Sequence, residues 1–384
     1  MKRRALTQSG STFLDVVRFG AAFVVFLGHL GAIIPSAAQF THLAHIAVCI
    51  FFVLSGFIIR MVVTNRVTTM KDFLIDRASR IYSVAIPALA LTLLCAALST
   101  LVNPAGWGVS EELSSWSHVP LQVLTNLTFT AQIWGYETVP IFNSPFWSLS
   151  FECIYYLLFA LMFFRWDSKS VRVIFFLLLF AAGPAIVFLF PIWLLGCLLY
   201  DVYLWLDDKP YAWLLTSCLF LAVMLFAIFN WAFLGHLLVV TDLPHRTAWL
   251  QGFFSPSARH FFADSTGEVP WLLRASFSFY IAGIISSVSM LWALVTIDRF
   301  CPKIPRSIAT TIRWVAEGTF ALYLLHLPLI LLTISLSGGH PIFPYATTAL
   351  IGTACIVASR WFDRLKTAMR QRLHRAFPAR AKAI

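Results

Sequence analysis

Three side chains able to carry a charge occur in the stretch LDVVRFGAAFVVFLGH, residues 14–29, which is otherwise apolar. Asp15, Arg18 and His29 would each be costly in hydrocarbon unless they met a partner or a water-filled cavity. Arg18 and His29 are eleven residues apart, which is close to three helical turns, so a helix places them on one face about 16 Å apart. This face therefore combines a fixed cation with a titratable base that could take part in acid–base chemistry.

A second polar group occurs in residues 145–152, which read PFWSLSFE. The expected spans place Glu152 at the same depth in the membrane as His29, so its carboxylate could orient the imidazole and raise its basicity, as in a general base. Ser148 lies one helical turn before Glu152 on the same face, and a helix cap or an interhelical hydrogen bond is favoured for it over a nucleophile. Ser148 and Ser150 are also candidates for binding a substrate or an oxyanion.

Two arginines in the stretch FLIDRASRIY, Arg77 and Arg80, are three residues apart and share a helix face. Their guanidinium groups could form a fork for phosphate oxygens, although the positive-inside rule alone would also place arginines here. Arg18 at a similar depth favours phosphate binding. His326, in LYLLHLPL, lies at mid-membrane, where it could be a structural hydrogen bonder or a wall of the site that binds substrate.

The composition shows which elements must position these side chains. Of the residues, 59% are hydrophobic and 12% are charged, which indicates an all-α, polytopic integral membrane protein. Windows of about 20 apolar residues predict about ten transmembrane helices, near residues 13–34, 43–63, 81–102, 146–164, 171–189, 190–206, 211–233, 273–297, 318–336 and 341–361. The fifth and sixth meet at Phe190-Pro191, which we interpret as a tight outer turn. Ser55 and Gly56 in the second span should permit close helix approach.

Charge placement sets the expected topology. Lys2, Arg3 and Arg4 put the N-terminus in the cytoplasm by the positive-inside rule, and an even number of spans returns the C-terminus there. Residues 103–145 contain no lysine or arginine and are expected outside. We therefore expect a cytoplasmic N-terminus at 1–12, one transmembrane domain at 13–361 and a basic cytoplasmic tail at 362–384. The net charge of +11 is explained by these basic inner segments, so no nucleic-acid partner is expected, and the tail should contact membrane lipid.

Two other features of the sequence concern a possible signal peptide and the cysteines. The basic start, an apolar stretch and Ser36-Ala37-Ala38 imitate a cleavable signal peptide, but the polar residues at 15, 18 and 29 interrupt its apolar region. The seven cysteines show no spacing typical of a metal site, so no metal is expected.

The chain resembles the acyltransferase type 3 family, which is marked by an arginine and a histidine in its first span. LDVVRFGAAFVVFLGH, IFFVLSGFIIR, FLIDRASRIY, FWSLSFECIYYLLF and ALYLLHLPL are similar to the family's blocks in the same order. The departures are Gly28 before the histidine and Phe320, where the family often has tyrosine. The resemblance implies that His29 is the essential histidine, Arg18 its paired arginine, and Glu152 the acidic end of the Trp-Ser-Leu-x-x-Glu block, with the arginine-rich block at 77–80.

The resemblance also implies the reaction. Members of this family transfer an acyl group, usually acetyl from cytoplasmic acyl-CoA, to a hydroxyl of an extracytoplasmic or lipid-linked saccharide, and we expect a bacterial cytoplasmic membrane as the location. A secondary transporter for a sugar or another polar molecule stays open as an alternative, although we find no inverted repeat with matched helix breaks. A non-catalytic scaffold is the third class, but it would not need His29 and Glu152 at one depth.

Overall fold

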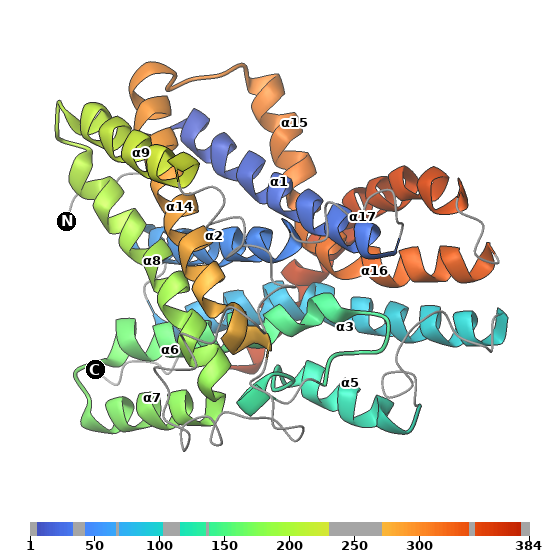
Figure 1. The fold of residues 1–384 in the computed structure, drawn as a ribbon. Helices are drawn as coiled ribbons and strands as arrows, with labels where there is room; N and C mark the ends of the chain where they lie inside the picture. Colours follow the sequence, from blue (N-terminus) through green and yellow to red (C-terminus); the bar gives the residue numbers. More distant parts are fainter. Residues whose placement is uncertain are drawn as a thin grey trace. The chain divides into compact units, whose positions relative to one another are not determined.

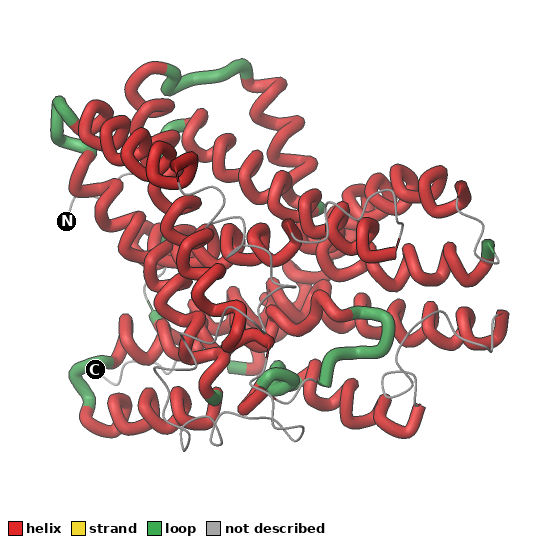
Figure 2. The backbone as a smooth tube through the Cα atoms, viewed as in Figure 1, coloured by secondary structure: helices red, strands yellow, loops and turns green. Residues whose placement is uncertain are grey.

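The computed structural model describes residues 6–33, 43–66, 69–102, 116–135, 138–229, 271–337 and 342–377. Helices dominate this part of the chain, and no β-strand occurs in it (Figure 2). The prediction of an all-α fold is therefore confirmed for the described residues. The outer loop predicted around residues 235–270 lies outside them.

Eight helices in the described ranges are long and apolar enough to cross a membrane. Such helices satisfy their own backbone hydrogen bonds, which lipid cannot do. They are α1 (Gln8–Ile33), α2 (Leu43–Asn65), α3 (Met70–Val102), α6 (Trp147–Arg165), α8 (Pro184–Leu206), α9 (Ala212–Phe229), α14 (Trp271–Phe300) and α16 (Thr319–Leu336) (Figure 1). An integral membrane protein is the class that this pattern indicates.

The other two predicted spans correspond to α7 (Lys169–Ala182) and α17 (Ile342–Ala376). With 14 residues, α7 is only about 21 Å long, which is less than the thickness of the hydrocarbon core. In contrast, α17 has 35 residues and joins the predicted last span to most of the basic tail in one helix. The predicted outer segment 103–145 also contains a short helix, α5 (Val119–Leu127).

The predicted turn at Phe190-Pro191 is wrong. Pro191 lies inside α8, which continues through it, as membrane helices can because neighbouring groups satisfy the freed carbonyl. The chain breaks instead at Gly183, which has a φ of +82° and precedes Pro184, the first residue of α8. A Cβ on Gly183 would lie 2.6 Å from the backbone nitrogen of Trp134, so both the conformation and the space require glycine.

The chain forms two compact units. The first contains Met1–Arg66, Gln132–Tyr136 and Phe176–Ala316, and the second contains Val67–Ala131, Glu137–Phe175 and Glu317–Ile384. The first unit therefore holds α1, α2, α8, α9, α14 and nearly all of α15 (Arg306–Glu317). The second unit holds α3, α5, α6, α16 and α17, and α7 contributes residues to both.

In the first unit, α8 packs against α2 and α14, and α14 also packs against α9 and α1. Two glycines let α2 and α8 touch through their backbones. A Cβ on Gly56 would lie 2.0 Å from the carbonyl oxygen of Trp193, and a Cβ on Gly196 would lie 2.0 Å from that of Val53. The expectation that Gly56 permits close helix approach is confirmed.

In the second unit, α16 packs against α3 and α17, and α3 also packs against α17 and α6. Asn143, just before α6, is 1% exposed. Its side-chain nitrogen donates to the hydroxyl of Thr92 on α3 at 2.7 Å and to the carbonyl oxygen of Leu324 on α16 at 2.8 Å. These two bonds fix the start of α6 against both neighbouring helices, because an unbonded amide would be costly in the apolar interior.

Candidate active site

Arg18 and His29 both lie on α1, which is one uninterrupted helix. The spacing predicted from the sequence therefore holds, with the two side chains on one face about 16 Å apart along the axis. His29 is partly buried, and its Nδ1 lies 3.0 Å from the carbonyl oxygen of Val25. Because a carbonyl oxygen can only accept, Nδ1 carries the proton in the neutral ring and Nε2 is the basic nitrogen.

The carboxylate of Asp15 lies between two arginines. Arg18 Nη1 is 3.4 Å from Asp15 Oδ1, and Arg313 Nε on α15 is 3.8 Å from Asp15 Oδ2. Arg313 also donates to the hydroxyl of Ser11 at 3.4 Å. The side chains of Arg18 and Asp15 are 21% and 14% exposed, whereas that of Arg313 is 62% exposed. Two guanidinium groups thus contact one carboxylate.

Glu152 lies on α6 and accepts a hydrogen bond from the hydroxyl of Tyr156, one turn further along the same helix. Glu152 is partly buried, whereas Tyr156 is only 4% exposed. A phenol donating to a carboxylate is a charge-assisted hydrogen bond, which is stronger than one between two neutral groups. The bond therefore fixes the direction of the Glu152 carboxylate along the face of α6.

Arg77 and Arg80 on α3 have different surroundings. Arg77 packs its guanidinium over two aromatic rings, with its central carbon 5.9 Å from the ring centres of both Phe73 and Tyr156. Its Nε is buried without a hydrogen-bond partner among the described residues, and its charge interacts with that of Glu152. Arg80 is exposed. One arginine of the pair thus faces the interior of the second unit, and the other faces outward.

Ser148, Ser150 and His326 are all buried. The hydroxyl of Ser148 lies 2.8 Å from that of Tyr323 on α16, which agrees with the interhelical hydrogen bond favoured from the sequence. His326 is 0% exposed, and its Nδ1 lies 2.7 Å from the carbonyl oxygen of Leu322, so Nε2 is again the basic nitrogen. These three residues lie in the second unit with Glu152.

The second unit therefore brings several predicted site residues into one polar column along α6. Ser148, Glu152 and Tyr156 are spaced four residues apart and share one helix face. Tyr323 reaches this column from α16 through Ser148, and Arg77 reaches it from α3 through the Tyr156 ring. Arg18 and His29 lie in the first unit, on α1. Tyr156 was not singled out from the sequence, although its spacing from Glu152 is a signal that could have found it.

One ion pair joins two residues that no sequence pattern connected. Arg60 on α2 places its Nε 3.0 and 3.1 Å from the two carboxylate oxygens of Asp201 on α8. The two residues are 141 positions apart, so no local pattern joins them. Arg60 ends the block IFFVLSGFIIR, and an arginine in an apolar span was the signal that a partner must exist.

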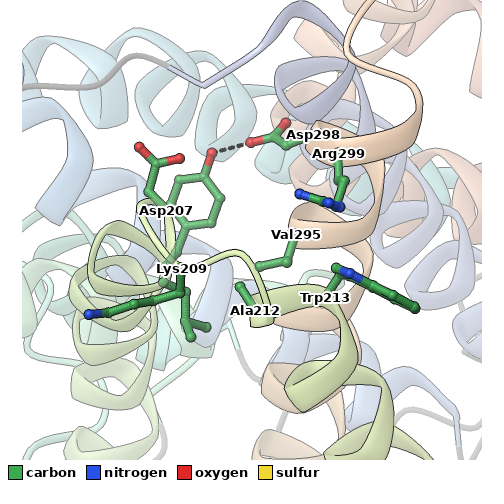
Figure 3. Close-up of a pocket in the computed structure, with 9 residues that line it drawn as sticks. Asp207, Lys209, Ala212, Trp213, Val295, Asp298 and Arg299 are labelled. Atoms are coloured by element: carbon green, nitrogen blue, oxygen red, sulfur yellow. Dashed lines mark hydrogen bonds between the residues drawn. The ribbon is translucent and has the colours of Figure 1, made fainter.

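A cavity of about 310 Å³ lies in the first unit where α8, α9 and α14 meet. None of the site residues predicted from the sequence lines it. Its wall includes Asp207, Lys209, Trp213, Asp298 and Arg299 (Figure 3). The carboxylate of Asp298 accepts hydrogen bonds from the hydroxyls of Tyr203 and Thr7, and the ammonium of Lys209 lies 5.6 Å from the ring centre of Trp205. Two of its charged groups are thus engaged by the protein itself.

The described residues contain no group of three or more His, Cys, Asp or Glu side chains that could hold a metal ion. A family model described as an acyltransferase domain matches residues 11–361, which takes in the described helices from α1 to the first half of α17. No curated protein and no solved structure matches the chain.

Proposed function

Because the chain belongs to the acyltransferase type 3 family, it is a membrane acyltransferase, and we propose that it transfers an acyl group from acyl-CoA to a saccharide hydroxyl. The observation that carries the proposal is the α1 face, which holds Arg18 and His29 on one helix, with the Nδ1 of His29 held by Val25 and its Nε2 as the base. The donor is cytoplasmic acyl-CoA, with acetyl as the acyl group, and the acceptor is an extracytoplasmic or lipid-linked saccharide. The membrane is the cytoplasmic membrane of a bacterium.

The donor would be held by arginines. Arg18, Arg77 and Arg80 are assigned to the phosphates of acyl-CoA because guanidinium groups match phosphate oxygens in charge and geometry. The two guanidinium groups that meet at Asp15, those of Arg18 and Arg313, support this assignment, as does the exposure of Arg80. The thioester arm would then extend along α1 towards His29.

The chemical step requires a base. His29 Nε2 takes the proton of the saccharide hydroxyl as the hydroxyl oxygen attacks the thioester carbonyl. The new C–O bond forms, the C–S bond breaks, and the CoA thiolate leaves and takes up the proton from His29. A covalent acyl-enzyme that is resolved by the acceptor is the other order of events. Glu152 orients the imidazole in either case.

The acceptor side is assigned to Ser148, Ser150 and His326. All three are buried polar groups in a helical interior, where such groups are rarely kept without a use. The hydroxyl hydrogen of Ser148 can rotate between acceptors, so it can serve the Tyr323 hydroxyl or a substrate oxygen. Ser148 and Ser150 are also the candidates for stabilising the oxyanion that forms on the thioester carbonyl.

The test uses inside-out membrane vesicles that contain the full chain, with acetyl-CoA labelled in its acetyl group added outside and cell-envelope saccharide present both outside and in the vesicle lumen. The expected result is covalent label on the saccharide, formed by the wild-type protein and absent with His29→Ala. Uptake of saccharide without acyl transfer would support a transporter and overturn the proposal. Absence of both uptake and transfer would also overturn it.

A further inference from the structure

The polar column on α6 contains a tyrosine to which no role has been assigned. Tyr156 is 4% exposed, and its hydroxyl donates to the carboxylate of Glu152. Its ring also lies under the guanidinium of Arg77, at 5.9 Å from ring centre to the central carbon. One side chain therefore contacts both a site carboxylate and a site cation.

The Glu152 carboxylate has a polar hydrogen-bond donor and a cation close to it. Tyr156 donates a hydrogen bond to the carboxylate, and hydrogen bonding to a charged form stabilises that form. The positive charge of Arg77 lies close enough to interact with it. Cys153 on α6 and Tyr323 on α16 also interact with this carboxylate, and a thiol and a phenol are both neutral at physiological pH.

We propose that Tyr156 is a positioning residue of the transfer reaction: its hydroxyl holds the Glu152 carboxylate in one direction, and the Arg77 guanidinium packed over its ring holds the tyrosine in place. The proposal rests on the proposed function, in which Glu152 orients the base His29. A glutamate side chain has three rotatable bonds, so without this bond the carboxylate would sample several directions. Tyr156 acts on the reaction through Glu152 and need not touch the substrate.

A purely structural role for Tyr156 must be distinguished from this one. A buried tyrosine usually needs a partner for its hydroxyl, and the Glu152 carboxylate would meet that need even if the bond had no effect on catalysis. Both roles predict some loss of stability when the hydroxyl is removed. Only the positioning role predicts that loss of the hydroxyl changes kcat and its pH dependence while the KM for acyl-CoA is kept.

The first measurement is the pH dependence of acyl transfer by Tyr156→Phe, a change that keeps the ring and removes the hydroxyl. Loss of the bond to the carboxylate should move the acidic limb of the kcat profile up by about one to two pH units. The KM for acyl-CoA should stay within about twofold, since no substrate contact is removed. Tyr82→Phe is the matched control, because the Tyr82 hydroxyl donates to the backbone oxygen of Leu127 in the same unit, and its acidic limb should coincide with the wild-type limb.

The second measurement does not need activity. Infrared titration of the purified protein, without donor or acceptor, follows the carboxyl band that is lost in Glu152→Gln. Its midpoint should shift up in Tyr156→Phe and also in Arg77→Met, which removes the cation, while Arg77→Lys should shift less. If the wild-type protein transfers no acyl group, the proposed function fails while this titration still tests the bond. Coincident midpoints in wild type and Tyr156→Phe would overturn the inference, whatever the activity.

Discussion

Arg60 on α2 and Asp201 on α8 form an ion pair with 3.0 Å between Nε and Oδ1. The side chains are 19% and 36% exposed, so the pair is only partly shielded. Removing one partner leaves the other charge uncompensated in a mainly apolar region. Asp201→Asn should therefore lower the free energy of unfolding by about 2 kcal/mol, below the range for fully buried pairs.

The measurement is thermal unfolding in detergent. Asp167→Asn is the control, since Asp167 is exposed between α6 and α7. This variant should have the same melting temperature as the wild-type protein. Replacing both Arg60 and Asp201 by leucine should restore much of the stability, because no unpaired charge remains. A double variant that is less stable than Asp201→Asn would contradict this account.

His29 and Glu152 should behave as one catalytic unit. His29→Ala should abolish transfer while the protein still inserts and purifies, because one partly buried polar side chain is lost. Glu152→Gln should lower kcat by about 10² to 10⁴, the usual contribution of a positioned acid–base group. The double variant should lose little more than His29→Ala, since residues that act together are not additive. If the fold-losses in kcat of the two single variants multiply in the double variant, the two residues act independently.

The arginines of α1 and α15 should contribute unequally to donor binding. Arg18→Ala should weaken CoA binding by about tenfold or more, because a charge-assisted contact is removed, and Arg18→Lys should restore only part of it. Arg313→Ala should have a smaller effect, since this side chain is 62% exposed. Arg306→Ala, on the exposed start of α15, is the control. Calorimetry with CoA checks this, and unchanged affinity in all variants would place the donor elsewhere.

The backbone contact between α2 and α8 should tolerate no added carbon. A Cβ on Gly56 or Gly196 would meet a carbonyl oxygen at 2.0 Å, so Gly56→Ala must push the helices apart and should cost about 3 kcal/mol of stability or more. Gly20→Ala is the matched control, because nothing lies within 4 Å of a Cβ there. This change should be neutral or stabilise α1 slightly. The melting temperatures of the two variants report the difference, and equal values would contradict the contact.

The topology expected from the charges can be read with reporter fusions. A reporter at Ser117 should be outside, and reporters at Lys169 and Arg306 should be inside, because the basic residues flank the latter positions. The measurement is the activity of a reporter that folds in only one compartment. A reporter on the opposite side at any of these three positions would contradict the expectation that His29 and Glu152 lie at the same depth in the membrane.

Much of the helical architecture followed from local sequence patterns. Long apolar runs determine membrane helices because the backbone must satisfy its own hydrogen bonds in lipid. The relation between Arg18 and His29 was also local, since a fixed rise per residue converts eleven positions into one helix face. The contact of Glu152 with Tyr156 is also local in the sequence, as the two residues are four positions apart on α6.

The tertiary structure determines where the chain breaks and which side chains each polar residue contacts. Pro191 continues α8, whereas Gly183 breaks the chain, because close packing against Trp134 leaves no space for a side chain at Gly183. Arg77 and Arg80 have the same local pattern, but only Arg77 lies over the rings of Phe73 and Tyr156.

The partners of the remaining polar groups come from distant parts of the chain. Arg313 reaches Asp15 from α15, Asp201 reaches Arg60 from α8, and Tyr323 reaches Ser148 from α16. Helical periodicity shows which face of a helix is polar, but it carries no information about which other helix covers that face. The partner is selected by the packing of whole helices, where backbone approach at glycines and the need to bond every buried polar group act together.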